Sequence, residues 1–231
     1  MLYKRHRFPA EIISYAVFLY YRFSLSLRDI REILAYRGIE VSYEAIRKWG
    51  GKFGQAYAHK LRKRAPQRGD KWHLDEVSIK INGQQHWLWR AVDQDGYEFD
   101  ILVQKRRDTA SAMRFFCKLL IGLQYSPRII ITDKLRSYGA AKRRLNLKVE
   151  HRQHKRLNNR IENSHQATRQ QERKMRRFKS PPLTQRFLSI HGVINNLFKV
   201  GRYKQSANNY RQTFKNALDN WHCVTQQNYC V

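Results

Sequence analysis

Hydrophobic residues in the first 60 positions recur every three to four residues, which is the period of amphipathic helices. The pattern predicts one helix starting at Pro9, a second after Ser26 and a third after Ser42. Asp29 completes a start that resembles a capping box, and Gly38 suits the end of the second helix. A helix, a short turn with glycine and a basic helix form the helix-turn-helix pattern, although an ordinary three-helix core with solvated charges fits the same spacing.

From Lys71 the hydrophobic period changes to two, which indicates β-strands. Two strands, WHLDEVSIKI and QQHWLWRAVD, meet at Asn82–Gly83, a strong hairpin signal, and YEFDILVQ supplies a third strand. An amphipathic helix then leads to the β-branched run Ile129–Ile131, which is typical of a parallel strand buried on both faces. A short helix over 137–145 and a strand in KVEHRQ follow. This order predicts an α/β fold class: a ribonuclease-H-like (integrase-like) core preceded by an all-α helix-turn-helix domain.

The best linker candidate is LRKRAPQRGDK, which is charged and contains Pro66 and Gly69. We therefore expect four parts along the chain. They are a helix-turn-helix domain over residues 1–60, a linker over 61–70, the ribonuclease-H-like core over 71–180 and a C-terminal helical segment over 181–231.

The chain is strongly basic. Its 231 residues include 46 Lys and Arg against 18 Asp and Glu, a net charge of +28. A charge of this size repels itself unless a polyanion neutralises it, and nucleic acid is the usual partner. The excess is greatest over 134–204, with 20 basic and 3 acidic residues. No apolar run approaches the length of a membrane span, and three scattered cysteines fit neither a disulfide framework nor a metal knuckle, so we expect a cytoplasmic protein.

Acidic residues in this basic background are candidates for chemistry. Asp133 follows the buried strand at its carboxyl end, where open α/β sheets bind ligands, although aspartate is also a common helix cap. Glu162 lies in an expected helix over 160–177 among Arg and Lys residues, where a solvated, salt-bridged face is the alternative.

Asp75 lies on the apolar face of its predicted strand, with Val77 and Ile79, whereas Glu76 lies on the face of Ser78 and Lys80. An unpaired buried carboxylate is costly. Asp75 is therefore expected to be protonated, paired with a buried Arg or His, or bound to a metal.

Several segments together resemble the transposases of bacterial insertion sequences, and more narrowly the insertion-sequence-six family. They are WHLDEVSIKINGQQHWLWRAVDQDG, RRDTASAMRFF, IITDKLRSYGAA, EHRQHKRLNNRIENSH and RFKS. The resemblance extends from Arg5 to about Phe198, and it implies an N-terminal helix-turn-helix and an Asp-Asp-Glu (DDE) catalytic core. Only 28 residues separate Asp133 from Glu162, which is fewer than most members carry.

The resemblance implies that Asp75, Asp133 and Glu162 form the catalytic triad. It also implies that Arg169 replaces the basic residue, more often lysine, two helical turns after the glutamate. Phosphodiester chemistry suits two magnesium ions, with manganese as a substitute, and hard cations prefer carboxylate ligands. We expect Asp75 to bridge both ions, with Asp133 and Glu162 each completing one site. A zinc site at the nearby histidines is disfavoured because a strand places His151 and His154 on opposite faces and no cysteine pair stands nearby.

Double-stranded DNA is the expected partner, both as the terminal repeats of the element and as target. On the third predicted helix, the outward residues Tyr43, Arg47 and Lys48 are expected to contact it. Beside the active site, the expected contacts are Lys134, His154, Lys155, Arg156 and Arg160. A homodimer or higher oligomer follows from the resemblance, since transposases act on two ends at once.

The expected function is therefore that of a DNA transposase in the bacterial cytoplasm, associated with the nucleoid, that cleaves and transfers strands. A helix-turn-helix regulator would need no acidic triad. A ribonuclease-H-like nuclease would need no domain for recognising element ends. An inactive transposase remnant is a further alternative, because element copies decay.

Overall fold

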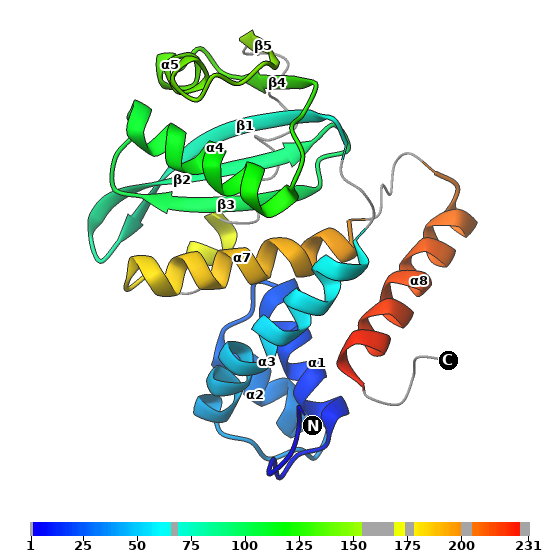
Figure 1. The fold of residues 1–231 in the computed structure, drawn as a ribbon. Coiled ribbons are helices and arrows are strands. Elements are labelled where there is room, and N and C mark those ends of the chain that lie inside the picture. Colours follow the sequence, from blue (N-terminus) through cyan, green and yellow to red (C-terminus); the bar gives the residue numbers. More distant parts are fainter. Residues whose placement is uncertain (1, 66–68, 154–168, 174–177, 200–204, 227–231) are drawn as a thin grey trace. The chain divides into compact units, whose positions relative to one another are not determined.

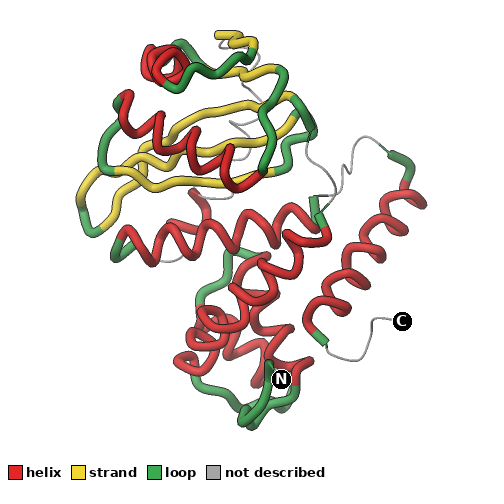
Figure 2. The backbone as a smooth tube through the Cα atoms, viewed as in Figure 1, coloured by secondary structure: helices red, strands yellow, loops and turns green. Residues whose placement is uncertain are grey.

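The computed structural model describes residues 2–65, 69–153, 169–173, 178–199 and 205–226 (Figure 1). The chain divides into two compact units, one of residues 1–65 with 190–231 and the other of residues 66–189. Figure 2 shows that the strands are confined to the second unit. Within the described ranges, no helix is both long enough and apolar enough to cross a bilayer.

The helical unit contains α1 (Ala10–Arg22), α2 (Leu27–Tyr36), α3 (Tyr43–Arg64) and α8 (Ala207–Thr225). The capping box predicted for α2 is present, because Ser26 and Asp29 bond reciprocally to each other's backbone N–H. At the other end of α2, Gly38 has φ +72° and its N–H donates to Ala35 O, while Ile39 N–H donates to Leu34 O. These two bonds form a Schellman motif, so the predicted stop at Gly38 is confirmed.

Helix α3 is longer than the sequence pattern indicated. It continues to Arg64, so the first four residues of the stretch expected as a linker are helical. The reason is that its buried stripe does not stop at Trp49 but runs on through Phe53, Tyr57 and Leu61.

The second unit is built on a five-stranded sheet in the order β3-β2-β1-β4-β5. The strands are β1 (Lys71–Ile81), β2 (Gln84–Asp93), β3 (Glu98–Gln104), β4 (Ile129–Thr132) and β5 (Glu150–Gln153). Strand β2 is antiparallel to β1 and β3, whereas β4 is parallel to β1 and β5 is parallel to β4. Helix α4 (Thr109–Leu123) links β3 to β4, and α5 (Arg136–Arg144) links β4 to β5 (Figure 1). The predicted ribonuclease-H-like wiring is confirmed.

Local sequence signals explain the main turns and the core of this unit. Asn82 and Gly83 both have positive φ, 49° and 78°, as a two-residue type I′ hairpin requires. One face of the sheet packs against α4 and α5. Its core consists mainly of large apolar side chains from the central strands and both helices: Trp72, Leu74, Trp89, Ala91, Phe115, Phe116, Leu119 and Tyr138.

The segment that leads into α7 (Pro181–Leu197), and α7 itself, pair with strand edges of the sheet. Asn82 N–H donates to Phe178 O at 2.9 Å, and Phe178 forms an isolated parallel bridge with Ile81. The side-chain amide of Gln185 accepts from Val103 N at 2.8 Å and donates to Ile101 O at 3.0 Å. Gln185 thus pairs with backbone groups of the edge strand β3, which protects that edge.

Candidate active site

Asp75 and Asp133 lie next to each other because of the register between β1 and β4. In the parallel ladder Leu74 pairs with Thr132, so the next residue of each strand is an aspartate. Strand β4 ends at Thr132, whereas β1 continues to Ile81. The two carboxylates therefore meet at the carboxyl end of β4, where an open sheet edge leaves room for a ligand.

A third carboxylate joins them. Ligand oxygens of Asp75, Glu76 and Asp133 lie within 4.8 Å of one another. Like charges at this separation repel, so the cluster favours a bound cation or a proton. Three hard oxygen donors within reach of one point suit Mg²⁺ or Mn²⁺ and do not suit a soft metal. The residues present therefore fit a divalent cation.

Sequence reasoning missed Glu76. Its face also carries Ser78 and Lys80, which are exposed, yet Glu76 itself is buried and its side chain has no exposed surface. The Tyr138 hydroxyl donates a 2.7 Å hydrogen bond to Glu76 Oε2. Arg107 Nε donates to Glu76 Oε1 at 2.6 Å. Glu76 is thus held from two sides at the edge of the core.

Burial dominates the electrostatics of Glu76. Loss of hydration raises the pKa of its carboxyl from 4.5 to about 7, and the neighbouring charge of Asp133 acts in the same direction. The Tyr138 hydrogen bond and the Arg107 guanidinium oppose this rise in pKa. Burial also raises the pKa of Tyr138 well above its usual value, so this phenol remains a hydrogen-bond donor at neutral pH.

Asp133 is not the N-cap of the helix that follows it. The N-cap of α5 is Leu135, which makes no side-chain cap. Asp133 Oδ1 accepts a 2.9 Å hydrogen bond from Leu135 N, which stabilises the turn between β4 and α5. Its other oxygen, Oδ2, contacts Arg107 at 3.2 Å. The turn thus accounts for only one of the two carboxylate oxygens of Asp133.

Arg90 is the candidate for a buried basic partner of Asp75, because it lies directly opposite Asp75 in the antiparallel ladder. Arg90 is almost fully buried and forms a 2.9 Å ion pair with Glu98.

The structure describes some of the remaining predicted site residues but not all of them. Tyr43, Arg47 and Lys48 all lie on the exposed side of α3, and Lys134 is exposed directly after Asp133. Arg169 is exposed on the described helical turn 169–173. The predicted ligand Glu162 and the predicted DNA contacts His154, Lys155, Arg156 and Arg160 fall outside the described residues.

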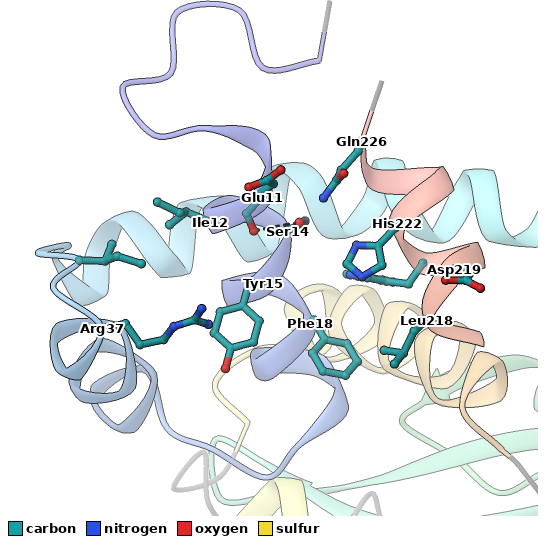
Figure 3. Close-up of a pocket in the computed structure, with 12 residues that line it drawn as sticks. Glu11, Ile12, Ser14, Tyr15, Phe18, Arg37, Leu218, Asp219, His222 and Gln226 are labelled. Atoms are coloured by element: carbon teal, nitrogen blue, oxygen red, sulfur yellow. Dashed lines mark hydrogen bonds between the residues drawn. The ribbon is translucent and has the colours of Figure 1, made fainter. Parts of the chain in front are cut away.

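The helical unit contains a cavity of about 840 Å³ that is separate from the acidic cluster. It lies between α1, the segment after α2, and α8, and Figure 3 shows Tyr15, Phe18 and His222 along its wall. Arg37 lies over the Tyr15 ring at 5.1 Å. Two carboxylates, Glu11 and Asp219, line the cavity. Among the residues that the structure describes, no third acid joins them, so the cavity lacks the convergent acids of the cluster.

Comparison with known proteins supplies the family context. A family profile described as a DDE domain matches residues 69–201. The transposase for insertion sequence-like element IS431mec of Staphylococcus aureus is 36% identical over 171 residues, covering 71% of this chain and 76% of that protein. The transposase for insertion sequence element IS257 in transposon Tn4003, also from Staphylococcus aureus, matches with the same identity and coverage. The solved structure of the HTLV-2 integrase catalytic core domain in complex with magnesium (dimeric form) matches at 15% identity with a TM-score of 0.36, and the match covers 70% of this chain and 89% of that one.

Proposed function

This chain belongs to the DDE transposases, and from that premise we propose that it binds the ends of its insertion sequence, cleaves DNA there and joins the freed 3′-hydroxyl ends to target DNA. The observation that carries the proposal is the convergence of Asp75, Glu76 and Asp133 at the carboxyl end of β4. A regulator that only binds DNA has no use for three carboxylates at one point, because they would repel the phosphates of its ligand.

Asp75 and Asp133 would hold two divalent cations together with Glu162. When bound, such ions lower the pKa of a nucleophilic hydroxyl, stabilise the leaving oxygen and offset the charge of the phosphate. The carboxylates would position the ions, and the exposed Lys134, which follows Asp133, would contact a DNA phosphate beside them. In cleavage, water attacks the phosphorus atom, the P–O3′ bond breaks, and a 3′-hydroxyl and a 5′-phosphate are formed. In transfer, that 3′-hydroxyl attacks a phosphorus atom of the target and displaces the 3′-oxygen of the target strand.

A described contact of Glu172 supports Glu162 as the third ligand. Glu172 Oε1 accepts a hydrogen bond from Lys80 N at 3.3 Å, which fixes this turn beside β1. Along a strand, Lys80 and Asp75 are separated by about 17 Å. Ten residues of the helix expected from the sequence would span about 15 Å between Glu172 and Glu162. The two lengths match, so the expected helix is long enough for Glu162 to reach Asp75.

DNA binding by the helical unit rests on the exposed side of α3, which presents Tyr43, Arg47 and Lys48. The Schellman turn after α2 and the Ser42 cap set the start of this helix, as in a helix-turn-helix whose second helix enters the major groove. Because transposition joins two ends, we propose that the protein acts as a dimer or higher oligomer on DNA.

The experiment that tests the proposal is incubation of the full-length protein with a labelled duplex carrying the element end, a supercoiled target plasmid and Mg²⁺. Nicking at the end followed by a covalent end–plasmid product is the expected result. Binding without cleavage would indicate a regulator or an inactive remnant, and cleavage without joining would indicate a nuclease. Asp133→Asn protein, run in parallel, controls for contaminating nucleases.

A further inference from the structure

Arg107 bridges two carboxylates of the acidic cluster, Glu76 and Asp133. It lies in the loop between β3 and α4, and its Nε donates to Glu76 Oε1 at 2.6 Å. Its Nη2 contacts the same Glu76 oxygen and also Asp133 Oδ2, at 3.2 Å. The guanidinium lies over the Trp87 ring, 5.0 Å from the ring centroid. Two carboxylates and one aromatic face therefore fix this cation in place.

The oxygen that Arg107 contacts on Asp133 is the one best placed to receive a metal ion. Asp133 Oδ1 already accepts the backbone N–H of Leu135, which belongs to the turn and cannot leave without disturbing it. Oδ2 is engaged by a side chain, and that side chain is about one-third exposed and so has solvent to move into. A divalent cation and the Arg107 guanidinium therefore need the same oxygen.

We propose that Arg107 is an internal counter-cation of the acidic cluster, which a divalent cation must displace from Asp133 Oδ2 on binding. The proposal rests on the metal site of the proposed function. Arg107 offsets the mutual repulsion of the carboxylates in the metal-free protein, and it weakens metal affinity for the same reason. Arg107 is a positioning residue, since it acts through Glu76 and Asp133.

The neighbouring arginine provides a matched control. Arg106 is exposed in the same loop and carries the same charge, but it is not among the groups that shift the pKa of Glu76. Arg106→Gln thus removes one positive charge near the site without removing the contact. Any difference between Arg107→Gln and Arg106→Gln measures the contact itself rather than the general field of the protein.

The test is the affinity of the full-length, DNA-free protein for Mn²⁺, measured from the electron paramagnetic resonance signal of the free ion. Charge-assisted hydrogen bonds of this kind are strong enough that Arg107→Gln should bind Mn²⁺ about tenfold more tightly than wild type. Arg106→Gln should change the affinity by less than about twofold, as expected for a screened surface charge. If Arg107→Gln binds Mn²⁺ no more tightly than Arg106→Gln, the proposal is wrong.

Two further variants keep the outcome decisive. If Arg107→Gln loses its cooperative thermal melt, the test is made with Arg107→Lys instead. Lysine keeps the positive charge, but it lacks the planar guanidinium that bridges both carboxylates. The Mn²⁺ affinity of Arg107→Lys should then rise above that of wild type, and an unchanged affinity would contradict the proposal. Asp133→Asn should lose Mn²⁺ binding, and retained binding there would overturn the metal site itself, separately from the role of Arg107.

Discussion

The hydroxyl of Tyr138 on α5 donates a 2.7 Å hydrogen bond to Oε2 of Glu76 on β1, and neither side chain is open to solvent. The bond ties the helix that follows Asp133 to the strand residue that follows Asp75. This hydrogen bond therefore stabilises the acidic cluster from inside the core.

This buried carboxyl predicts a pH dependence of stability in metal-free protein. The pKa of Glu76 is about 7 in the folded chain and 4.5 as its ordinary value. The folded state thus keeps a proton that the unfolded state releases, so the free energy of unfolding falls as pH rises from 4.5 to 7, by roughly 3 kcal/mol. Urea denaturation of wild type and Glu76→Gln across this range, with EDTA present, measures the difference.

Glu76→Gln should lose most of this decline in unfolding free energy, because an amide does not titrate. Glu150→Gln serves as the control, since Glu150 is exposed and pairs only at the surface with Arg152. Parallel pH curves for wild type and Glu76→Gln would contradict the assignment of the titration to Glu76.

The exposed side of α3 predicts a loss of specific DNA binding in Arg47→Ala. If Arg47 reads a base, the change should cost roughly 1–3 kcal/mol on element ends and much less on random DNA. In the free protein Arg47 is paired with Glu44 at the surface. Glu44→Gln should therefore leave binding intact or tighten it. Gel-shift titrations measure both affinities, and an equal loss on both DNAs would reduce Arg47 to a phosphate contact.

The basic segment 134–204 predicts that Lys155 and Arg156 contact phosphates. Replacing both with Gln should reduce the slope of log affinity against log salt by about 1.8, because each phosphate contact contributes about 0.9. The exposed pair Arg211 and Lys215 on α8 provides a control of equal charge. Fluorescence anisotropy between low and moderate salt measures the slopes. If both double variants have the same slope, Lys155 and Arg156 are solvated surface charges that contact no phosphate.

The close contact between α1 and α3 predicts that a side chain at position 54 in place of Gly54 destabilises the protein. A Cβ atom there would lie 2.7 Å from Cε2 of Tyr21, whose hydroxyl donates to Gly50 O. Gly54→Ala should therefore destabilise the protein by about 1–3 kcal/mol through overpacking. Gly122→Ala on α4 is the matched control, since nothing lies within 4 Å of its Cβ, and it should be neutral or stabilising by up to about 1 kcal/mol. Thermal melts that shift equally in both variants would argue against this close packing.

Much of the fold could be predicted from the sequence because its signals are local. Hydrophobic period, the Asn82–Gly83 turn and the Ser26 cap each act within a few residues, and together they fix the order of strands and helices. The sequence pattern predicts too short an α3 because Gly50 and Gly54 interrupt the apolar stripe. In the structure these glycines allow Tyr20 and Tyr21 of α1 to approach closely.

The candidate site was only partly predictable, for a physical reason. Asp75 and Asp133 stand out because each ends or interrupts an apolar pattern. Glu76 does not, since its face of β1 is polar near the hairpin, at Ser78 and Lys80, but packs against the core at Trp72 and Leu74. Its partners Arg107 and Tyr138 are 31 and 62 residues away along the chain. No local pattern carries such contacts, and only the folded sheet brings them together.

The central claim is that Asp133 is a metal ligand of a DNA-cleaving site, and Asp133→Asn tests it most directly. Asparagine can still accept the hydrogen bond from Leu135 N, so the turn, the fold and DNA binding should survive. What is lost is one negative charge needed to hold divalent cations. Mg²⁺-dependent nicking of element-end DNA should therefore fall by several orders of magnitude, to a level shared by Asp75→Asn and Glu162→Gln, because groups that act as one unit do not lose activity additively. Nicking by Asp133→Asn at a near wild-type rate would contradict the account.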